Sequence, residues 1–172
     1  MVEQVMWAGR FVTAVRDGRW EYVRRSRGIR AVVILAETDA GEILLVEQPR
    51  VPIGRPCLEL PAGLIGDEAG GADDSVEAAA VRELVEETGY RPGSVERLGD
   101  YYSSPGMLSE SFTLVRATGL ERVGEGGGVD GEEIVVHHVA RGEVARFIDA
   151  RRSAGIGIDA KLLLLGAASF DR

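Results

Sequence analysis

A short helical segment in the middle of the chain constrains the fold most. Residues 78–90 read AAAVRELVEETGY, in which three alanines and Leu84 favour a helix and Gly89 favours its end. Asp74 with Glu77 three positions later forms a capping box, so we expect the helix to start at Asp74. Its buried face is predicted from residues at helical spacing, namely Ala78, Val81, Val85 and Thr88.

The segments before the helix have the pattern of β-strands. Residues 9–25 alternate around Asp17-Gly18, and residues 31–48 hold two β-rich runs around the sequence TDAGE, so each stretch is predicted to be a hairpin. Residues 49–56 are expected to form an irregular loop, and residues 57–65 a short strand that breaks at Pro61.

The segments after the helix complete the pattern. We predict strands at 95–106, 109–120 and 134–140, a mobile acidic loop at 121–133, and helices at 141–155 and 157–170. Strands on both sides of a central helix, with helices at the end, predict a layered α/β domain with a mixed sheet.

Composition narrows the class of protein. A chain of 172 residues suits one domain, and a formal net charge of −8 disfavours a nucleic-acid-binding surface. A single cysteine, Cys57, excludes a disulfide within the chain and a cysteine-based zinc site, and we expect it to be a small buried side chain. The N-terminus lacks the pattern of a signal peptide and the apolar run at 161–170 is too short to cross a bilayer, so we expect a cytoplasmic protein without a membrane anchor.

Three carboxylates crowd the last turns of the predicted helix. Glu83 and Glu87 are four residues apart and share a face, Glu86 lies beside Glu83, and Arg82 is the nearest cation. Like charges at this spacing are destabilising, and negative charge near a helix C-terminus is unfavourable. The cluster is either a solvated acidic face or a site for a hard divalent cation such as Mg²⁺, which would remove the repulsion.

The sequence around these glutamates resembles the Nudix box. RELVEETGY at 82–90, preceded by PAGLI at 61–65, matches each fixed position of the second half of that box. The first half departs from it, because Asp74 stands where the box has Glu and ten residues rather than five separate it from Gly63. Glu68, in the inserted stretch 66–74, is the other candidate for the missing Glu, and Asp74 is equally well explained as a helix cap.

Flanking segments resemble the ADP-ribose pyrophosphatase and nucleotide-sugar hydrolase branch of the Nudix family. These are residues 46–65, residues 101–110 with their Ser-Pro-Gly loop, and the N-terminal hairpin. The resemblance implies a Nudix α/β/α sandwich at 29–172 and a small β appendage at 1–28 that pairs across a homodimer. It also implies Mg²⁺-dependent hydrolysis, with Mn²⁺ as the alternative ion, of ADP-ribose to AMP and ribose 5-phosphate.

The same resemblance assigns roles to individual residues. The metal would be held by Glu83, Glu86, Glu87 and the main-chain carbonyl of Ala62, with Arg82 orienting the glutamates. The base would be Glu132, with Glu133 as the second candidate. Substrate contacts would come from Arg50 and Glu110, and more weakly from Arg27, Arg55 and Trp20.

Three alternatives stay open. The enzyme could be a GDP-mannose or other nucleotide-sugar pyrophosphatase, the domain could bind a nucleotide without turnover, or the acidic helix could be purely structural. His137 and His138 are adjacent on a predicted strand and point to opposite faces, so we expect them to be structural and not to bind one metal ion together.

Overall fold

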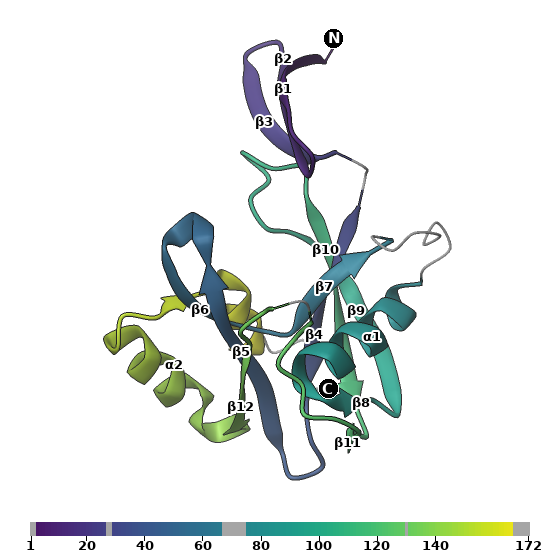
Figure 1. Cartoon of the computed structure of the whole chain (residues 1–172), viewed down its shortest axis with the longest axis vertical. Coiled ribbons are helices and arrows are strands. Elements are labelled where there is room, and N and C mark those ends of the chain that lie inside the picture. The colour runs from purple at the N-terminus through teal and green to yellow at the C-terminus, as the bar shows by residue number, and fades with distance from the viewer. Residues whose placement is uncertain (1–2, 27–28, 67–74, 130, 167–172) are drawn as a thin grey trace.

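The protein is built from two four-stranded sheets, one helix on each side of them and a smaller sheet that projects from one end (Figure 1). The computed structural model describes residues 3–26, 29–66, 75–129 and 131–166. The predicted α/β class with mixed sheets is confirmed. In the described part of the chain, no helix is long and apolar enough to cross a membrane.

Each of the two large sheets combines parallel and antiparallel neighbours. Strand β10 (Ser111–Thr118) runs parallel to β4 (Arg30–Ala36), and β13 (Gly157–Ile158) runs parallel to β6 (Arg55–Glu59), while the other neighbouring strands are antiparallel. The first sheet has the order β7 (Ala62–Ile65), β4 (Arg30–Ala36), β10 (Ser111–Thr118), β9 (Ser94–Tyr102). The second has the order β12 (Val135–Ala140), β5 (Glu42–Arg50), β6 (Arg55–Glu59), β13 (Gly157–Ile158).

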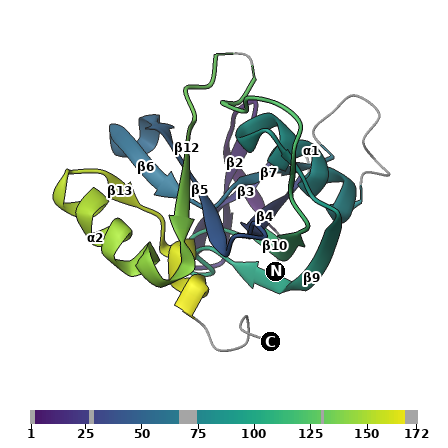
Figure 2. The same cartoon turned by 90° about the horizontal axis from the view of Figure 1, so that it is seen from below.

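Strand β4 has both faces buried. Val33 and Leu35 belong to a core shared with the second sheet and helix α2 (Val144–Ser153). Val32 and Ile34 point the other way, into a core shared with helix α1 (Val76–Thr88). Double burial explains why this strand reads as a continuous apolar run rather than an alternating one. Figure 2 shows α1 and α2 on opposite sides of the strands.

Helix α1 begins one residue later than predicted. Its N-cap is Ser75, whose hydroxyl accepts a hydrogen bond from the Ala78 N–H, and Asp74 lies outside the described residues. It ends at Gly89, which has a φ of 77° that favours glycine. The predicted buried face is wrong except at Thr88, because the helix packs through its small alanines. The buried residues are Val76, Ala79, Ala80, Leu84, Glu87 and Thr88.

The N-terminal hairpin is confirmed and gains a strand. Strands β2 (Val12–Asp17) and β3 (Trp20–Arg25) pair around a turn at Gly18, and β1 (Gln4–Ala8), which was not predicted, pairs with β2. This sheet projects from the rest of the protein (Figure 1). Strand β3 also bonds to the loop before β10, where the Val23 N–H donates to the Met107 carbonyl at 2.9 Å. The division at residue 28 stays a prediction.

The second predicted hairpin is confirmed only near its turn. The Thr38 N–H donates to the Glu42 carbonyl at 2.9 Å and an isolated bridge joins Glu37 to Ile43, but β4 and β5 then enter different sheets. Each strand buries both faces, so each needs partners on two sides that a simple hairpin cannot supply.

Two further segments differ from the prediction. Residues 49–56 are not irregular, because β5 continues to Arg50 and a 3₁₀ turn at Val51–Ile53 leads into β6. The expected helix at 157–170 is instead strand β13 and a 3₁₀ run at Ala160–Gly166, and residues 167–170 lie outside the described part. Pairing of Gly157 with Cys57 on β6 fixes the extended start of this segment.

The short strands β8 (Tyr90–Arg91) and β11 (Glu121–Arg122) pair beside the end of α1.

Candidate active site

A cavity of about 520 Å³ collects side chains from both large sheets, α1, β3, the loop before β12 and the C-terminal segment. Most of the predicted site residues line it. They are Arg50, Ala62, Arg82, Glu83, Glu86, Glu87, Glu110 and Glu132. The helix glutamates form one wall of the cavity.

Glu87 is the most deeply placed carboxylate of this wall. It lies on the same buried face of α1 as Leu84 and is 6% exposed. Its Oε2 accepts a hydrogen bond from the Ala62 N–H at 3.1 Å. Burial raises the pKa of the Glu87 carboxyl to about 8, against the lowering effect of the Ala62 bond, and the charges of Glu83 and Glu132 add to the rise.

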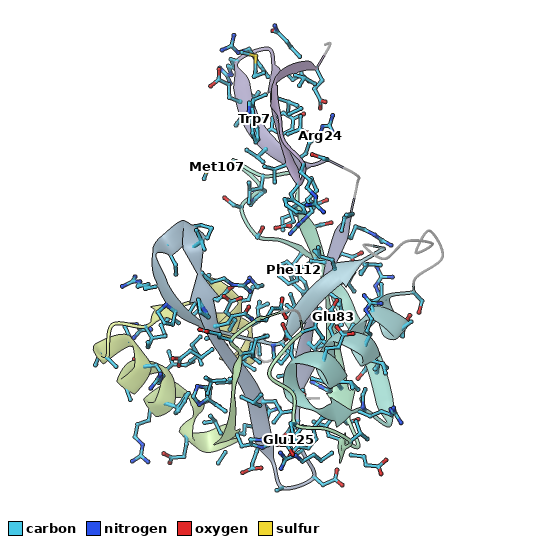
Figure 3. The ribbon with its side chains drawn as sticks, viewed as in Figure 1. Trp7, Arg24, Glu83, Met107, Phe112 and Glu125 are labelled. Atoms are coloured by element: carbon cyan, nitrogen blue, oxygen red, sulfur yellow. The ribbon has the colours of Figure 1, made fainter. Side chains whose placement is uncertain are left out.

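Glu83 lies one helical turn earlier and is held against β7. Its Oε1 accepts from the Leu64 N–H at 3.3 Å and from Arg82 Nη2 at 3.2 Å. Arg82 also donates to the Leu64 carbonyl at 2.9 Å, so it joins the helix to the strand. Burial raises the pKa of Glu83, and Arg82 opposes the rise. Figure 3 labels Glu83 beside β7.

Gly63 makes this close approach possible. A Cβ atom at position 63 would lie 1.8 Å from Cδ of Glu83, which is closer than any real contact. A side chain at position 63 would therefore displace the Glu83 carboxylate from its position beside β7.

The opposite wall carries cations, each of which is paired with its own carboxylate. Arg50 makes two hydrogen bonds to Glu59, at 2.7 and 2.8 Å, and Glu59 is 6% exposed. Lys161 pairs with Asp159, and its Nζ lies 6.0 Å from the centre of the Phe112 ring.

Arg25 supplies a third cation, from β3 of the projecting sheet. It pairs with Glu110 at 2.6 Å and lines the cavity, whereas Arg27, the predicted arginine of this region, lies outside the described residues.

Sequence reasoning missed Arg25, Glu59 and Lys161. For Lys161 a signal existed, because it is the single lysine among the 20 basic residues of the chain. Arg25 and Glu59 carry no such mark in the sequence, since their relevance depends on which strands meet at the cavity.

Glu132 reaches the cavity from the loop at 121–133, and Glu133 does not line it. The Glu132 side chain accepts a hydrogen bond from the Val129 N–H at 3.3 Å, within its own loop. Of the two candidates for the base, the structure thus places Glu132 beside the helix glutamates.

Several predicted residues lie elsewhere. Trp20 is 57% exposed and lines a separate hollow of about 410 Å³ with Tyr22 and Pro105. Arg55 points away and donates to the Gly155 carbonyl at 3.5 Å. Glu68, like Asp74, is outside the described residues.

The two histidines and the cysteine have separate surroundings. His137 contacts Glu47 at 3.2 Å and packs on Phe147, whereas His138 lies 3.7 Å from Glu42, so they face different partners as expected. Cys57 is buried as predicted. Burial and the nearby charge of Glu59 raise the pKa of its thiol to about 12, so the thiol stays protonated at neutral pH.

The acidic wall has the donor chemistry of a hard divalent cation site. Its donors are carboxylate oxygens, and burial raises the pKa values of Glu83 and Glu87, with a further rise from the neighbouring carboxylates. Within the described residues, no three His, Cys, Asp or Glu side chains are gathered closely enough to hold an ion as they stand. Glu83 and Glu87 each bond to a backbone N–H of β7 through one carboxylate oxygen.

Comparison with known proteins places most of the chain in one family model. The model described as NUDIX domain matches residues 27–151. An ADP-ribose pyrophosphatase of Bacillus subtilis (strain 168) is 35% identical over 122 residues, which are 70% of this chain and 63% of that protein. A GDP-mannose pyrophosphatase of Cronobacter sakazakii (strain ATCC BAA-894) is 34% identical over 147 residues, which are 81% of this chain and 72% of that protein.

A solved structure shows the same fold. The chain titled "Crystal structure of ADP compounds hydrolase" matches with a TM-score of 0.71 at 21% identity, covering 96% of this chain and 89% of that one. The present chain spans less than two thirds of the length of the Bacillus subtilis relative.

Proposed function

Because this chain belongs to the Nudix family, we propose that it hydrolyses the diphosphate linkage of a nucleoside diphosphate derivative with the help of Mg²⁺, or alternatively Mn²⁺. One observation carries the proposal. Glu83, Glu86 and Glu87 line a cavity that Arg50 and Lys161 also line, so a cation and a phosphate chain have complementary partners in one space.

The acidic wall would hold the metal ion. Its ligands would be the carboxylates of Glu83, Glu86 and Glu87 and the carbonyl oxygen of Ala62, all of which belong to residues lining the cavity. When bound, the ion would neutralise phosphate charge and lower the pKa of the attacking water. Arg82 would keep Glu83 in place through its bonds to Glu83 and Leu64.

The basic wall would bind and orient the substrate. Arg50 can donate to phosphate oxygens in pairs, and its bond to the buried Glu59 fixes the guanidinium in advance. Lys161 would add a compact positive charge, and the ring of Phe112 lies beneath it. Glu110, held by Arg25, would contact the substrate from the side of the projecting sheet.

Glu132 would act as the general base. It would take a proton from the water that attacks phosphorus, which requires its carboxylate to come within hydrogen-bonding reach of that water. Its place at the cavity, on a loop rather than in a strand, is compatible with that movement.

The substrate proposed first is ADP-ribose, which would give AMP and ribose 5-phosphate. GDP-mannose is the second candidate, because the relative named for that activity aligns over more of this chain. The N-terminal appendage at 1–28 would pair two chains into a homodimer, in which Trp20 would stack on the nucleobase of the substrate. Its exposed Met6, Trp7 and Phe11 support this role, and Figure 3 labels Trp7 on that sheet.

The test is a substrate panel. Release of products from ADP-ribose, GDP-mannose, NADH, UDP-glucose and diadenosine polyphosphates would be measured with Mg²⁺, with Mn²⁺ and with a chelator. Metal-dependent cleavage led by ADP-ribose supports the proposal. Absence of cleavage from every compound, with nucleotide binding retained, would support the role as a non-catalytic binding domain.

A further inference from the structure

The loop that brings Glu132 to the cavity is attached to helix α1. The N–H of Gly128 donates to the Glu86 carbonyl at 3.0 Å, and that of Gly127 donates to the Glu87 carbonyl at 2.8 Å. The last carbonyls of a helix have no partner within the helix. Here they are bonded by the loop, and they belong to two of the residues whose side chains form the acidic wall.

A second contact holds the start of the loop. The N–H groups of Val123 and Gly124 both donate to the Gly89 carbonyl, at 2.8 and 3.1 Å. A Cβ at position 89 would lie 2.3 Å from the Gly124 carbonyl oxygen. The two chain segments are therefore in backbone-to-backbone contact, with no room for a side chain between them.

Gly126 lies at the centre of this contact. A Cβ at position 126 would lie 2.5 Å from the Thr88 carbonyl carbon and 2.8 Å from the Glu87 carbonyl oxygen. Those atoms are helix backbone, which cannot move aside as a flexible side chain could. Gly127, the next residue, also has a positive φ, of 102°, yet a Cβ there would meet its first neighbour only at 3.9 Å.

We propose that Val123–Gly128, which we term the glycine clamp, sets the position of Glu132 relative to Glu86 and Glu87, and that Gly126 is its main positioning residue. The Glu132 N–H donates to the Val129 carbonyl at 3.1 Å and the Ile134 N–H donates to the Gly127 carbonyl at 3.3 Å, so the part of the loop that carries Glu132 is connected back to the clamp. This inference rests on the proposed role of Glu132 as the base. Gly126 itself touches neither substrate nor reacting atoms.

The first test needs no variant and no activity. Backbone hydrogen exchange in the wild-type protein should show slow exchange at residues 127 and 128, whose N–H groups bond to α1, and faster exchange at residues 129 and 132, whose N–H groups bond within the loop. Equal, fast exchange at all four would overturn the clamp. If the four differ as expected but the substrate panel shows no cleavage, the proposed function has failed while the clamp stands.

The second test compares neighbouring substitutions. Gly126→Ala should lower kcat about 10- to 100-fold, the loss expected when a catalytic group is displaced by about 1 Å. Gly127→Ala introduces a side chain at a φ of 102°, which is more restrictive than the 70° of Gly126, but without the collision, so it should lose less activity than Gly126→Ala. Equal losses in both variants would mean that backbone strain, rather than the contact with α1, explains the effect.

The third test separates positioning from structural support. In a Glu132→Gln background, Gly126→Ala should cause no further loss of kcat, because the group that it positions is already inactive. Binding of Mn²⁺, followed by its paramagnetic signal, should stay within about twofold of wild type in Gly126→Ala. Additive losses, or loss of Mn²⁺ binding, would assign the glycine to support of the helix instead. If Gly126→Ala does not fold, the exchange pattern of the wild type still decides the question.

Discussion

The two walls of the cavity differ in how their charges are balanced. On the acidic wall, Glu87 accepts from a backbone N–H, Glu83 accepts from a backbone N–H and from Arg82, and burial raises the pKa of both. On the basic wall, Arg50 and Lys161 each have a carboxylate of their own. The acidic wall therefore has three carboxylates, Glu83, Glu86 and Glu87, beside the one guanidinium of Arg82, whereas the basic wall is already neutralised pair by pair.

This difference separates two tasks. A wall that lacks positive charge gains most from a cation, so its residues should affect catalysis. On the basic wall each cation already bonds to a carboxylate, so a bound phosphate replaces part of that interaction. Substitutions on this wall should therefore change the affinity for substrate by smaller factors. The predictions below test this contrast in order of decreasing effect.

The largest loss is expected from Glu87→Gln. An amide is a poor ligand for Mg²⁺, so kcat/KM should fall by at least about 100-fold. Stability without metal should be unchanged or higher, because a neutral amide is easier to bury than a carboxylate. Glu77→Gln, on the exposed first turn of the same helix, is the matched control and should retain wild-type kinetics. A fully active Glu87→Gln enzyme would contradict the assignment of this wall.

Gly63→Ala should disturb the acidic wall without changing its charge. The new Cβ would occupy the space of the Glu83 carboxylate, so kcat should fall about 10- to 100-fold through displacement of the ligand. Gly142→Ala, where a Cβ meets nothing within 4 Å, serves as the control in the same kinetic assay. Similar activity of the two variants would show that the position of Glu83 is not important.

Lys161→Met tests the basic wall. It should raise KM about 10-fold with a smaller change in kcat, which corresponds to loss of one charged contact to phosphate. Asp159 keeps its bond from the residue 161 backbone N–H at 2.7 Å, so the fold should persist.

Because the chain has one lysine, a lysine-selective acylating reagent should modify only this residue and the N-terminal amine, and the proposed substrate should protect Lys161. A larger effect on kcat than on KM would break the contrast between the walls.

The smallest effect is expected from an ion pair outside the cavity. The hydrogen bond from Arg141 lowers the pKa of Glu37. In the unfolded chain the Glu37 carboxyl has a pKa of about 4.5, and its lower pKa in the folded protein stabilises the fold at pH values above 4.5. This stabilisation is lost as the pH falls through the folded pKa. Glu37→Gln should therefore reduce the free energy of unfolding by about 0.5 kcal/mol at pH 7 and by less at pH 3.5, with no effect on turnover. Urea unfolding of the wild type and the variant at the two pH values measures this loss of stability. A larger loss at pH 3.5 than at pH 7 would contradict the lowered pKa of Glu37.

The acidic wall could be predicted from the sequence because it is local. Glu83, Glu86 and Glu87 lie within five residues on one helix, and helical geometry alone brings their side chains close together. The helix itself follows from its alanines and from Gly89, although the capping residue and the buried face were not predicted correctly.

Most of the basic wall was decided by tertiary structure, because of its cations only Arg50 was assigned to the substrate from the sequence. Arg25 and Arg50 come from β3 and β5, and their carboxylate partners Glu110 and Glu59 lie in other segments, whereas Lys161, after β13, pairs with the nearby Asp159. Their meeting depends on how β4 and β5 separate into two sheets and on the pairing of β13 with β6.

The sequence by itself thus determined the helix and its glutamates, since these depend on neighbours three or four residues away. The fold decided which distant cations face them, because long-range strand pairing is set by burial of the whole core rather than by any local pattern.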